Sequence, residues 1–171
     1  AARAADGQRV WSDPAMRLPD ILSVSRTLIA TPAGGRLDKR AVLRRLAELL
    51  TQELPMDAKH LAALLEDRER LQSTGIGDGV AIPHTSAEEA TQQTAALLLC
   101  PQGVPFDAID GAPVFIVFGV VGPRRSTKEH LKTLARVSRL LRSPETRRAL
   151  LELKTPEEVF AFVEEQDRAL G

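Results

Sequence analysis

The sequence has little that would staple it covalently or carry it through a membrane. Among its 171 residues there is one cysteine, Cys100, which cannot form an internal disulfide. Its apolar runs are far shorter than the ~20 residues of a membrane-spanning helix. Its first residues lack the apolar core and cleavage signal of a secretory leader. We therefore expect a soluble protein of the cytoplasm, without direct insertion into a membrane.

The sequence also lacks an excess of charge and any spacing typical of metal ligands. Lysines and arginines number 23, aspartates and glutamates number 23, and the formal net charge is zero. Binding of nucleic acid without sequence preference depends on a basic surplus, so we expect no nucleic-acid partner. The three histidines and the single cysteine are scattered. They match no zinc-binding pattern, and we predict no metal site.

The hydrophobic pattern predicts one α/β domain. Residues 95–100 and 114–121 are short apolar runs between prolines and glycines, which is typical of buried strands. Residues 37–54 and 55–70 have apolar side chains at helical spacing, as does the C-terminal third of the chain. Four side chains are predicted to cap helices: Asp57, Ser126 (with Glu129 as its capping-box partner), Ser143 and Thr155.

We expect the folded domain to span residues 18–165. Residues 1–17 mix alanine, arginine and glycine without periodicity, and we expect them to form an N-terminal extension. Residues 166–171 are expected to form a C-terminal tail. The length of the chain is sufficient for one hydrophobic core.

A glycine-rich segment, STGIGDGVAIPHTS at residues 73–86, is the most unusual stretch. It is not a nucleotide-binding P-loop, because Gly79 is followed by Val80 and Ala81 where that loop has lysine and a hydroxyl residue. Its glycines also lack the spacing of the dinucleotide-binding fingerprint. Two interpretations remain, a turn that joins a helix to a strand and a reaction site.

The reaction-site interpretation rests on His84, at the end of this segment. A neutral imidazole is a competent nucleophile near pH 7. To accept a phosphoryl group it needs one free ring nitrogen and nearby donors for the phosphoryl oxygens. The hydroxyls of Ser73 and Thr74 and the loop amides from Gly75 onward are candidate donors. Arg68, at the end of the preceding helix, is a candidate cation.

A second histidine, His130, follows the predicted cap Ser126 by four residues. The electropositive end of a helix favours anions and disfavours a second proton on the ring. A role in the site and a purely structural role both fit this position. Asp107 and Asp110 lie beside a turn signal, so turn bonding is the alternative to acid–base catalysis for them.

At these residues the sequence resembles a known family, the enzyme IIA domain of the fructose/mannitol type in the bacterial phosphoenolpyruvate-dependent phosphotransferase system. The matching pieces occur in order along the chain. They are Arg68-Glu69 followed by residues 73–84, FDAIDGAPV at 106–114 and HLKTLARVSRLL at 130–141. Within the family, the chain is most similar to the stand-alone nitrogen-regulatory enzyme IIA.

The resemblance implies a mixed β-sheet with helices on both sides and no cofactor. It implies that a histidine phosphocarrier protein phosphorylates His84, and that Arg68 and His130 line that histidine. In the regulatory members, the phosphorylation state sets the binding of target proteins such as potassium-transport or sensor-kinase components. In the transport members, the phosphoryl group passes instead to a cysteine of an enzyme IIB and on to sugar.

One residue departs from the family pattern. Thr85 follows the histidine where the family usually has glycine, and a β-branched residue disfavours positive φ. We therefore expect the chain after His84 to take a different path. Three functions remain open: a regulatory phosphocarrier, a sugar-specific enzyme IIA, and a binding module that has lost the chemistry. Cys100 matches no nucleophile of the family.

Overall fold

The fold is built on one mixed, six-stranded sheet. The computed structural model describes residues 16–31 and 35–171. The strands run in the order β1-β5-β6-β3-β2, and β4 also pairs with β6. Their bounds are β1 Thr27–Ile29, β2 Gly75–Gly77, β3 Val80–Ala81, β4 His84–Ala87, β5 Thr94–Val104 and β6 Val114–Pro123. The two predicted strands are the long antiparallel pair β5 and β6 at the centre.

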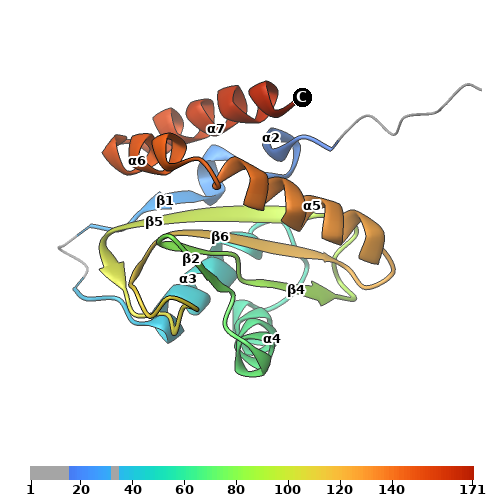
Figure 1. The fold of residues 1–171 in the computed structure, drawn as a ribbon. Helices are drawn as coiled ribbons and strands as arrows, with labels where there is room; N and C mark the ends of the chain where they lie inside the picture. Colours follow the sequence, from blue (N-terminus) through green and yellow to red (C-terminus); the bar gives the residue numbers. More distant parts are fainter. Residues whose placement is uncertain (1–15, 32–34) are drawn as a thin grey trace, which may run out of the picture.

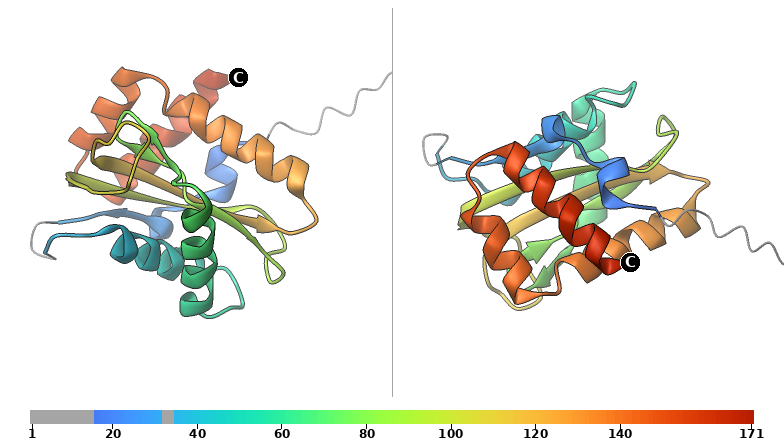
Figure 2. Two further views of the ribbon diagram at one scale, coloured as in Figure 1. Left: turned by 60° about the horizontal axis from the view of Figure 1, so that its bottom comes forward. Right: turned by 90° about the horizontal axis from the view of Figure 1, so that it is seen from above.

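Helices cover both faces of this sheet. In chain order they are α2 Leu18–Ile21, the 3-10 helix η1 Val24–Arg26, α3 Lys39–Leu50, α4 Ala58–Leu71, α5 Thr127–Leu140, α6 Pro144–Glu152 and α7 Pro156–Leu170. Figure 1 shows α5, α6, α7 and α2 above the sheet and α3 and α4 below it. Figure 2 shows the same two layers from below and from above. The predicted class, one α/β domain with a mixed sheet between helices, is confirmed.

Alternating side chains of the central strands divide the core in two. Ala96, Leu98 and Val117 belong to the cluster that packs against α3 and α4. Leu97 and Phe118 belong to the cluster on the other face, with side chains of α2, α5, α6 and α7. Both faces of β5 and β6 are therefore buried, which explains their nearly continuous apolar sequences.

The helix caps follow the sequence pattern with one exception. The side chains of Asp57, Ser143 and Thr155 each accept a hydrogen bond from a backbone N–H in the first turn. Ser126 makes no such bond, so the capping box predicted there is not formed. Its backbone has φ −109° and ψ 48°, outside the extended conformation that aims a capping hydroxyl at the helix.

The C-terminal residues belong to the domain. Residues 166–170, expected to form a tail, continue α7 instead. Asp167 is fully buried and accepts a hydrogen bond from Arg136 Nε at 2.6 Å and one from the Leu18 amide at 3.3 Å. Met16 is partly buried against the same core. The rest of the expected N-terminal extension, residues 1–15, lies outside the described residues.

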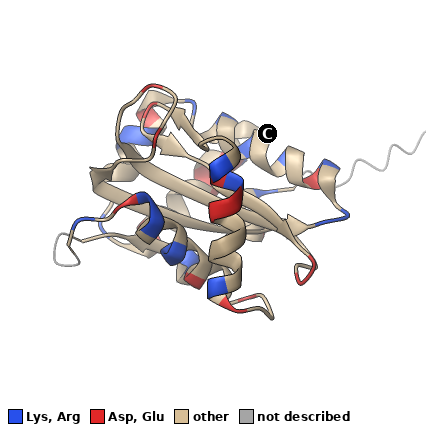
Figure 3. Ribbon diagram, turned by 90° about the horizontal axis from the view of Figure 1, so that it is seen from below, with Lys and Arg blue, Asp and Glu red and all other residues tan. Residues whose placement is uncertain are grey.

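Charges of both signs lie on the face formed by α3 and α4, with basic residues in the majority on α3, as Figure 3 shows. None of the described helices combines the length and the apolar character needed to cross a membrane. The part of the chain that the structure describes also holds no group of three or more histidine, cysteine or acidic side chains placed to bind a metal ion.

Candidate functional site

Pro83 lies between β3 and β4, the two short strands that pair with β6, and His84 begins β4. β3 and β4 pair with β6 in one continuous parallel register, from Val80 opposite Ile116 to His84 opposite Val120. Pro83 has no N–H to donate, but its carbonyl still accepts a hydrogen bond from the Val120 amide at 2.9 Å. His84 is therefore fixed to the central sheet at its backbone.

The ring of His84 is held by one of its two nitrogens. Nδ1 lies 2.7 Å from the carbonyl oxygen of Ile82. A carbonyl only accepts, so Nδ1 carries the proton and donates it. Nε2 makes no hydrogen bond within the described residues and keeps its lone pair. This is the arrangement that a nucleophilic imidazole needs.

The ring of His130 lies beside that of His84. Their centroids are 5.8 Å apart, with an angle of 53° between the ring planes. His130 is in the first turns of α5, and its Nδ1 lies 2.9 Å from Oε1 of Gln93. The structure thus brings together the two histidines that the sequence singled out. Gln93 carries no sequence signal and was missed, because only the tertiary fold places it against His130.

The surroundings keep both rings neutral near pH 7. Burial lowers the pKa of His84, and the positive charge of Arg68 lowers it further. The hydrogen bond to Ile82 and the negative charge of Glu69 oppose this shift of the pKa without reversing it. Burial also lowers the pKa of His130, with His84 as the second cause. The third histidine, His60, lies exposed on α4.

Arg68 lies in the last turn of α4, half-buried, and supplies the predicted positive charge near His84. One of its guanidinium nitrogens, Nη1, donates to the carbonyl of Gln72 at 2.9 Å. This bond closes the end of α4 and leaves the guanidinium further N–H groups for a ligand.

Glu69, next to Arg68, anchors the glycine-rich loop through hydrogen bonds from Thr74. Its side chain is buried and accepts hydrogen bonds from the amide and the hydroxyl of Thr74. It also forms an ion pair with Lys39 at 2.8 Å, and the Lys39 ammonium lies over the ring of Phe106. The sequence motif contained Glu69, but its role as the loop's anchor appears only in the structure.

The candidate phosphate donors at residues 73–75 already donate hydrogen bonds to other groups of the protein. The Ser73 hydroxyl donates to the carbonyl of Phe106 at 2.8 Å and accepts from the Gly75 amide at 3.1 Å. The Thr74 hydroxyl donates to Glu69. A Cβ on Gly75 would lie 2.8 Å from Cα and Cβ of Ala108, so this glycine permits a close approach of two loops. These residues shape the loop, and none of these bonds is to His84.

The second loop contains the two aspartates near the turn signal. Asp110 accepts hydrogen bonds from the amides of Asp78 and Ala112, at 3.1 and 3.0 Å, which is the turn bonding considered as one alternative. Asp107 is exposed and lies 3.8 Å from Lys39. Asp110 therefore shows the turn bonding that its context predicted, while Asp107 makes an ion pair instead.

Thr85 continues the strand that begins at His84. It lies in β4 opposite Val121, and the only non-glycine residues with positive φ in the described ranges are Asp78 and Asp107. A β-branched residue suits an extended strand. The expected difference from family members, which usually have glycine at this position, stays a prediction.

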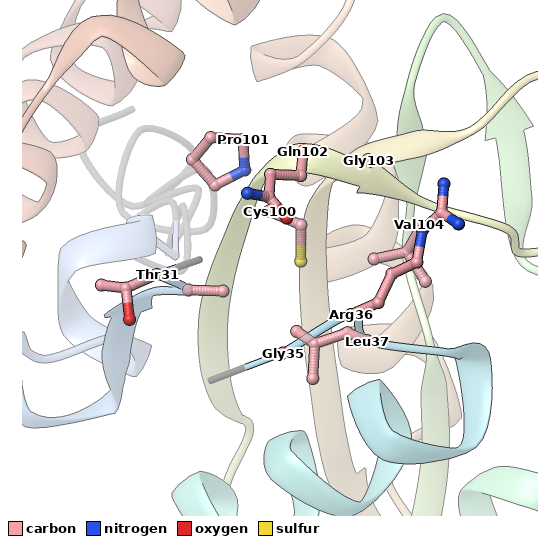
Figure 4. A pocket seen from close by; sticks show the side chains of 10 residues that line it. Thr31, Gly35, Arg36, Leu37, Cys100, Pro101, Gln102, Gly103 and Val104 are labelled. Carbon is pink, nitrogen blue, oxygen red and sulfur yellow. The ribbon is translucent and has the colours of Figure 1, made fainter. Parts of the chain in front are cut away.

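Cys100 lies away from this site. It is buried in β5, where burial raises the pKa of its thiol to about 12. Figure 4 shows it in the lining of a small pocket, with Thr31, Leu37 and Val104 among its neighbours. The volume of this pocket is only about 20 Å³, so the pocket has little room for a ligand beyond one or two waters.

The fold and this site define a class of protein: a mixed-sheet α/β domain with a pair of neutral histidines at the sheet edge. Residues 28–166 match the family model described as "Phosphoenolpyruvate-dependent sugar phosphotransferase system, EIIA 2". The chain belongs to that family.

Known relatives agree with this assignment. A "Nitrogen regulatory protein" of Pseudomonas aeruginosa is 37% identical over 149 residues, which are 86% of this chain and 95% of the relative. The crystal structure of "Nitrogen Regulatory Protein IIA-Ntr" from Neisseria meningitidis superimposes with a TM-score of 0.79 at 31% identity, over 85% of this chain and 98% of that one. The mannitol enzyme IIA of Escherichia coli, solved in complex with phosphorylated enzyme IIB, shares the fold with a TM-score of 0.69 at 16% identity, over 84% of this chain and 96% of that one.

Proposed function

We propose that this protein is a regulatory phosphoryl carrier of the nitrogen-regulatory type. It accepts a phosphoryl group on His84 from a histidine phosphocarrier protein and controls target proteins by its phosphorylation state. The observation that carries the proposal is the geometry of His84, whose Nδ1 is held by the Ile82 carbonyl while Nε2 stays unbonded. The nitrogen-regulatory relatives, which match nearly their whole length to this chain, support the regulatory role.

The transfer is a displacement at phosphorus. The lone pair of His84 Nε2 forms a bond to the phosphorus of the donor's phosphohistidine. The phosphorus–nitrogen bond to the donor breaks, and its electron pair returns to the donor's ring. Nδ1 keeps its proton and continues to donate to Ile82. The phosphoryl group arrives already activated on the donor, so the step needs no cofactor.

Positive charge near His84 stabilises the transferred group. A phosphoryl group carries about two negative charges at neutral pH, by analogy with other phosphorylated side chains. The guanidinium of Arg68 and the N-terminal end of α5 both favour a negative charge beside His84. In the transition state such preorganised groups contribute most of the catalysis.

The phosphorylation state then changes the surface seen by a partner. Among the residues that the structure describes, four large apolar side chains are exposed, at Leu71, Ile76, Ile109 and Leu131. They lie at the end of α4, in β2, in the loop of residues 106–111 and in the first turns of α5. New negative charge beside such apolar surface changes a partner's affinity by about 1–3 kcal/mol, the usual range of allosteric coupling. Potassium-transport and sensor-kinase components are the proposed classes of target.

The test is phosphorylation in a reconstituted cascade. Purified protein is incubated with phosphoenolpyruvate, enzyme I and the cognate phosphocarrier, and incorporation is followed by intact mass. The wild type is expected to gain one phosphoryl group, and His84→Ala none. His60→Ala, which changes an exposed histidine on the same molecule, is the matched control and should behave as wild type. Labelling of His84→Ala would refute the site.

A second assay separates regulation from sugar transport. In cells that lack the gene, a regulatory carrier predicts broad changes in nitrogen or potassium physiology, restored by the wild type and not by His84→Ala. Loss of growth on one sugar alone would identify a transport enzyme IIA that passes its phosphoryl group to an enzyme IIB. A wild type that stays unphosphorylated in a working cascade would identify an inert binding module.

A further inference from the structure

The neighbour of His130 is a buried amide with an unusual bonding pattern. Gln93 precedes β5, and only 9% of its surface is exposed. Its Oε1 lies 2.9 Å from Nδ1 of His130. Its Nε2 is buried without a hydrogen-bond partner in the part of the chain that the structure describes. An unsatisfied buried donor costs free energy, so this side chain is not placed there for stability alone.

A glycine in the central strand makes room for this amide. Gly122 lies in β6 opposite Ser86. A Cβ built on Gly122 would come within 2.7 Å of Cδ of Gln93 and still closer to both of its terminal atoms. The φ angle of Gly122 is not positive, so the backbone does not require glycine there. The Gln93 amide occupies the space that a side chain at residue 122 would fill.

Resting on the proposed function, we propose that Gln93, seated on Gly122, is a positioning residue for phosphoryl transfer. Its side-chain carbonyl holds the Nδ1–H of His130, so that Nε2 is the nitrogen that His130 offers to a phosphoryl group on His84. The bond from His84 to the Ile82 carbonyl fixes the other ring in the same way. Each imidazole is thus locked by its Nδ1 and leaves Nε2 free within the described residues.

The hydrogen bond between Gln93 and His130 decides which nitrogen of His130 takes up the proton that neutralises the incoming negative charge. A neutral imidazole with Nδ1–H has a lone pair at Nε2, which does not bind a phosphoryl oxygen. When the negatively charged group reaches His84, His130 takes up one proton from solvent at Nε2 and donates a hydrogen bond from this new N–H to a phosphoryl oxygen. The resulting imidazolium still donates Nδ1–H to Gln93. Only an acceptor at this position serves both protonation states, and the amide oxygen is such an acceptor.

Two independent substitutions test the hydrogen bond between Gln93 and His130. Gln93→Leu removes both the side-chain oxygen that accepts from His130 and the unpaired Nε2 donor. Gly122→Ala keeps Gln93 but places a methyl group where its amide lies. Gln92→Leu, at the exposed neighbouring residue, is the matched control. Both substitutions are expected to slow phosphoryl transfer to His84 by roughly 10–100-fold, the usual loss when a residue that orients an active group is removed. The double variant should be no slower than the slower single variant, because both remove the same bond.

A spectroscopic readout distinguishes positioning from general stability. In the unphosphorylated wild type, ¹⁵N spectra of the histidine rings should show His130 protonated at Nδ1. In Gln93→Leu the same ring should show a mixture of the two tautomers, while thermal stability is equal or higher because the buried unpaired donor is gone. Gln92→Leu should match the wild type in both measurements.

The outcomes separate this inference from the proposed function. If His130 of the wild type is protonated at Nε2, or if Gln93→Leu leaves both the tautomer and the rate unchanged, the inference is overturned although His84 is still phosphorylated. A rate that falls only in proportion to unfolding also overturns it. If the wild type is not phosphorylated at all, the proposed function fails, and the tautomer of His130 still decides whether Gln93 holds that ring.

Discussion

Removing the carboxylate of Glu69 is expected to destabilise the protein and loosen the loop before His84. In Glu69→Ala, Lys39 loses the nearer of its two ion-pair partners and keeps only the exposed Asp107 at 3.8 Å, and the amide and hydroxyl of Thr74 lose their acceptor. Breaking a buried ion pair on one side costs about 3–5 kcal/mol. The Lys39 side chain is 22% exposed and regains some hydration, so we expect about 3 kcal/mol.

The expected loss is a large part of a typical stability of about 5–15 kcal/mol, and denaturation by urea measures it. Glu69→Gln keeps one acceptor for Thr74 and should cost less, about 1–2 kcal/mol. Glu66→Ala is the control, because Glu66 is one turn earlier on α4 and makes only a surface ion pair with Arg40 at 3.6 Å. That variant should lose less than about 1 kcal/mol.

Glu69→Ala also affects His84, through hydrogen bonds of the backbone. The carbonyl of Thr74 accepts from the amide of Ile82 at 3.0 Å, and the carbonyl of Ile82 holds the ring of His84. Glu69→Ala is therefore expected to slow phosphorylation of His84 even in conditions where the variant stays folded. A loss below about 1 kcal/mol in Glu69→Ala, with a normal rate, would refute the anchoring role of this residue.

Three further predictions follow from the site and the C-terminal helix. The pKa values of His84 and His130 are lowered in the folded state, so the unfolded chain binds more protons below about pH 6.5. Stability should fall as the pH drops through that value and level off below the folded-state pKa values. Replacing both histidines by alanine should flatten this part of the profile, and an unchanged slope would contradict the burial of the rings. Arg68→Ala is expected to slow phosphoryl transfer by roughly 10–100-fold, the equivalent of a charge-assisted hydrogen bond. Its stability should change by less than about 0.5 kcal/mol, and equal losses of rate and stability would make the residue structural. Asp167→Ala should cost about 3–5 kcal/mol in urea denaturation, because it leaves the guanidinium of Arg136 buried without its partner. A loss below about 1 kcal/mol would mean that the last residues act as a tail after all.

Local patterns were sufficient to predict α3 to α7 and the two central strands, but not α2 or η1. Continuous apolar runs give buried strands, and helical periodicity gives α3 and α4, because these signals depend on neighbours along the chain. The short strands β2 and β3 have no such signal. They form because the glycine loop folds back on itself beside β6, where Val80 lies opposite Ile116.

The candidate site was predictable only in part, for the same reason. His84 stands out in the sequence because a proline and a glycine loop precede it. The bonds that hold the site come from distant residues, such as the Phe106 carbonyl for Ser73 and the amide of Gln93 for His130. Ser73 had the right chemistry for a phosphate donor, but the fold supplies it with a closer acceptor.

The most direct test of the account is to locate the phosphoryl group on the ring of His84. The protein is phosphorylated in the reconstituted cascade with ¹⁵N-labelled histidine, and the two ring nitrogens are observed by NMR. Because the Ile82 carbonyl holds Nδ1–H, we predict that the phosphoryl group is bonded to Nε2 of His84 and that Nδ1 keeps its proton. A phosphoryl group on Nδ1 of His84, or on any other residue, would contradict the account.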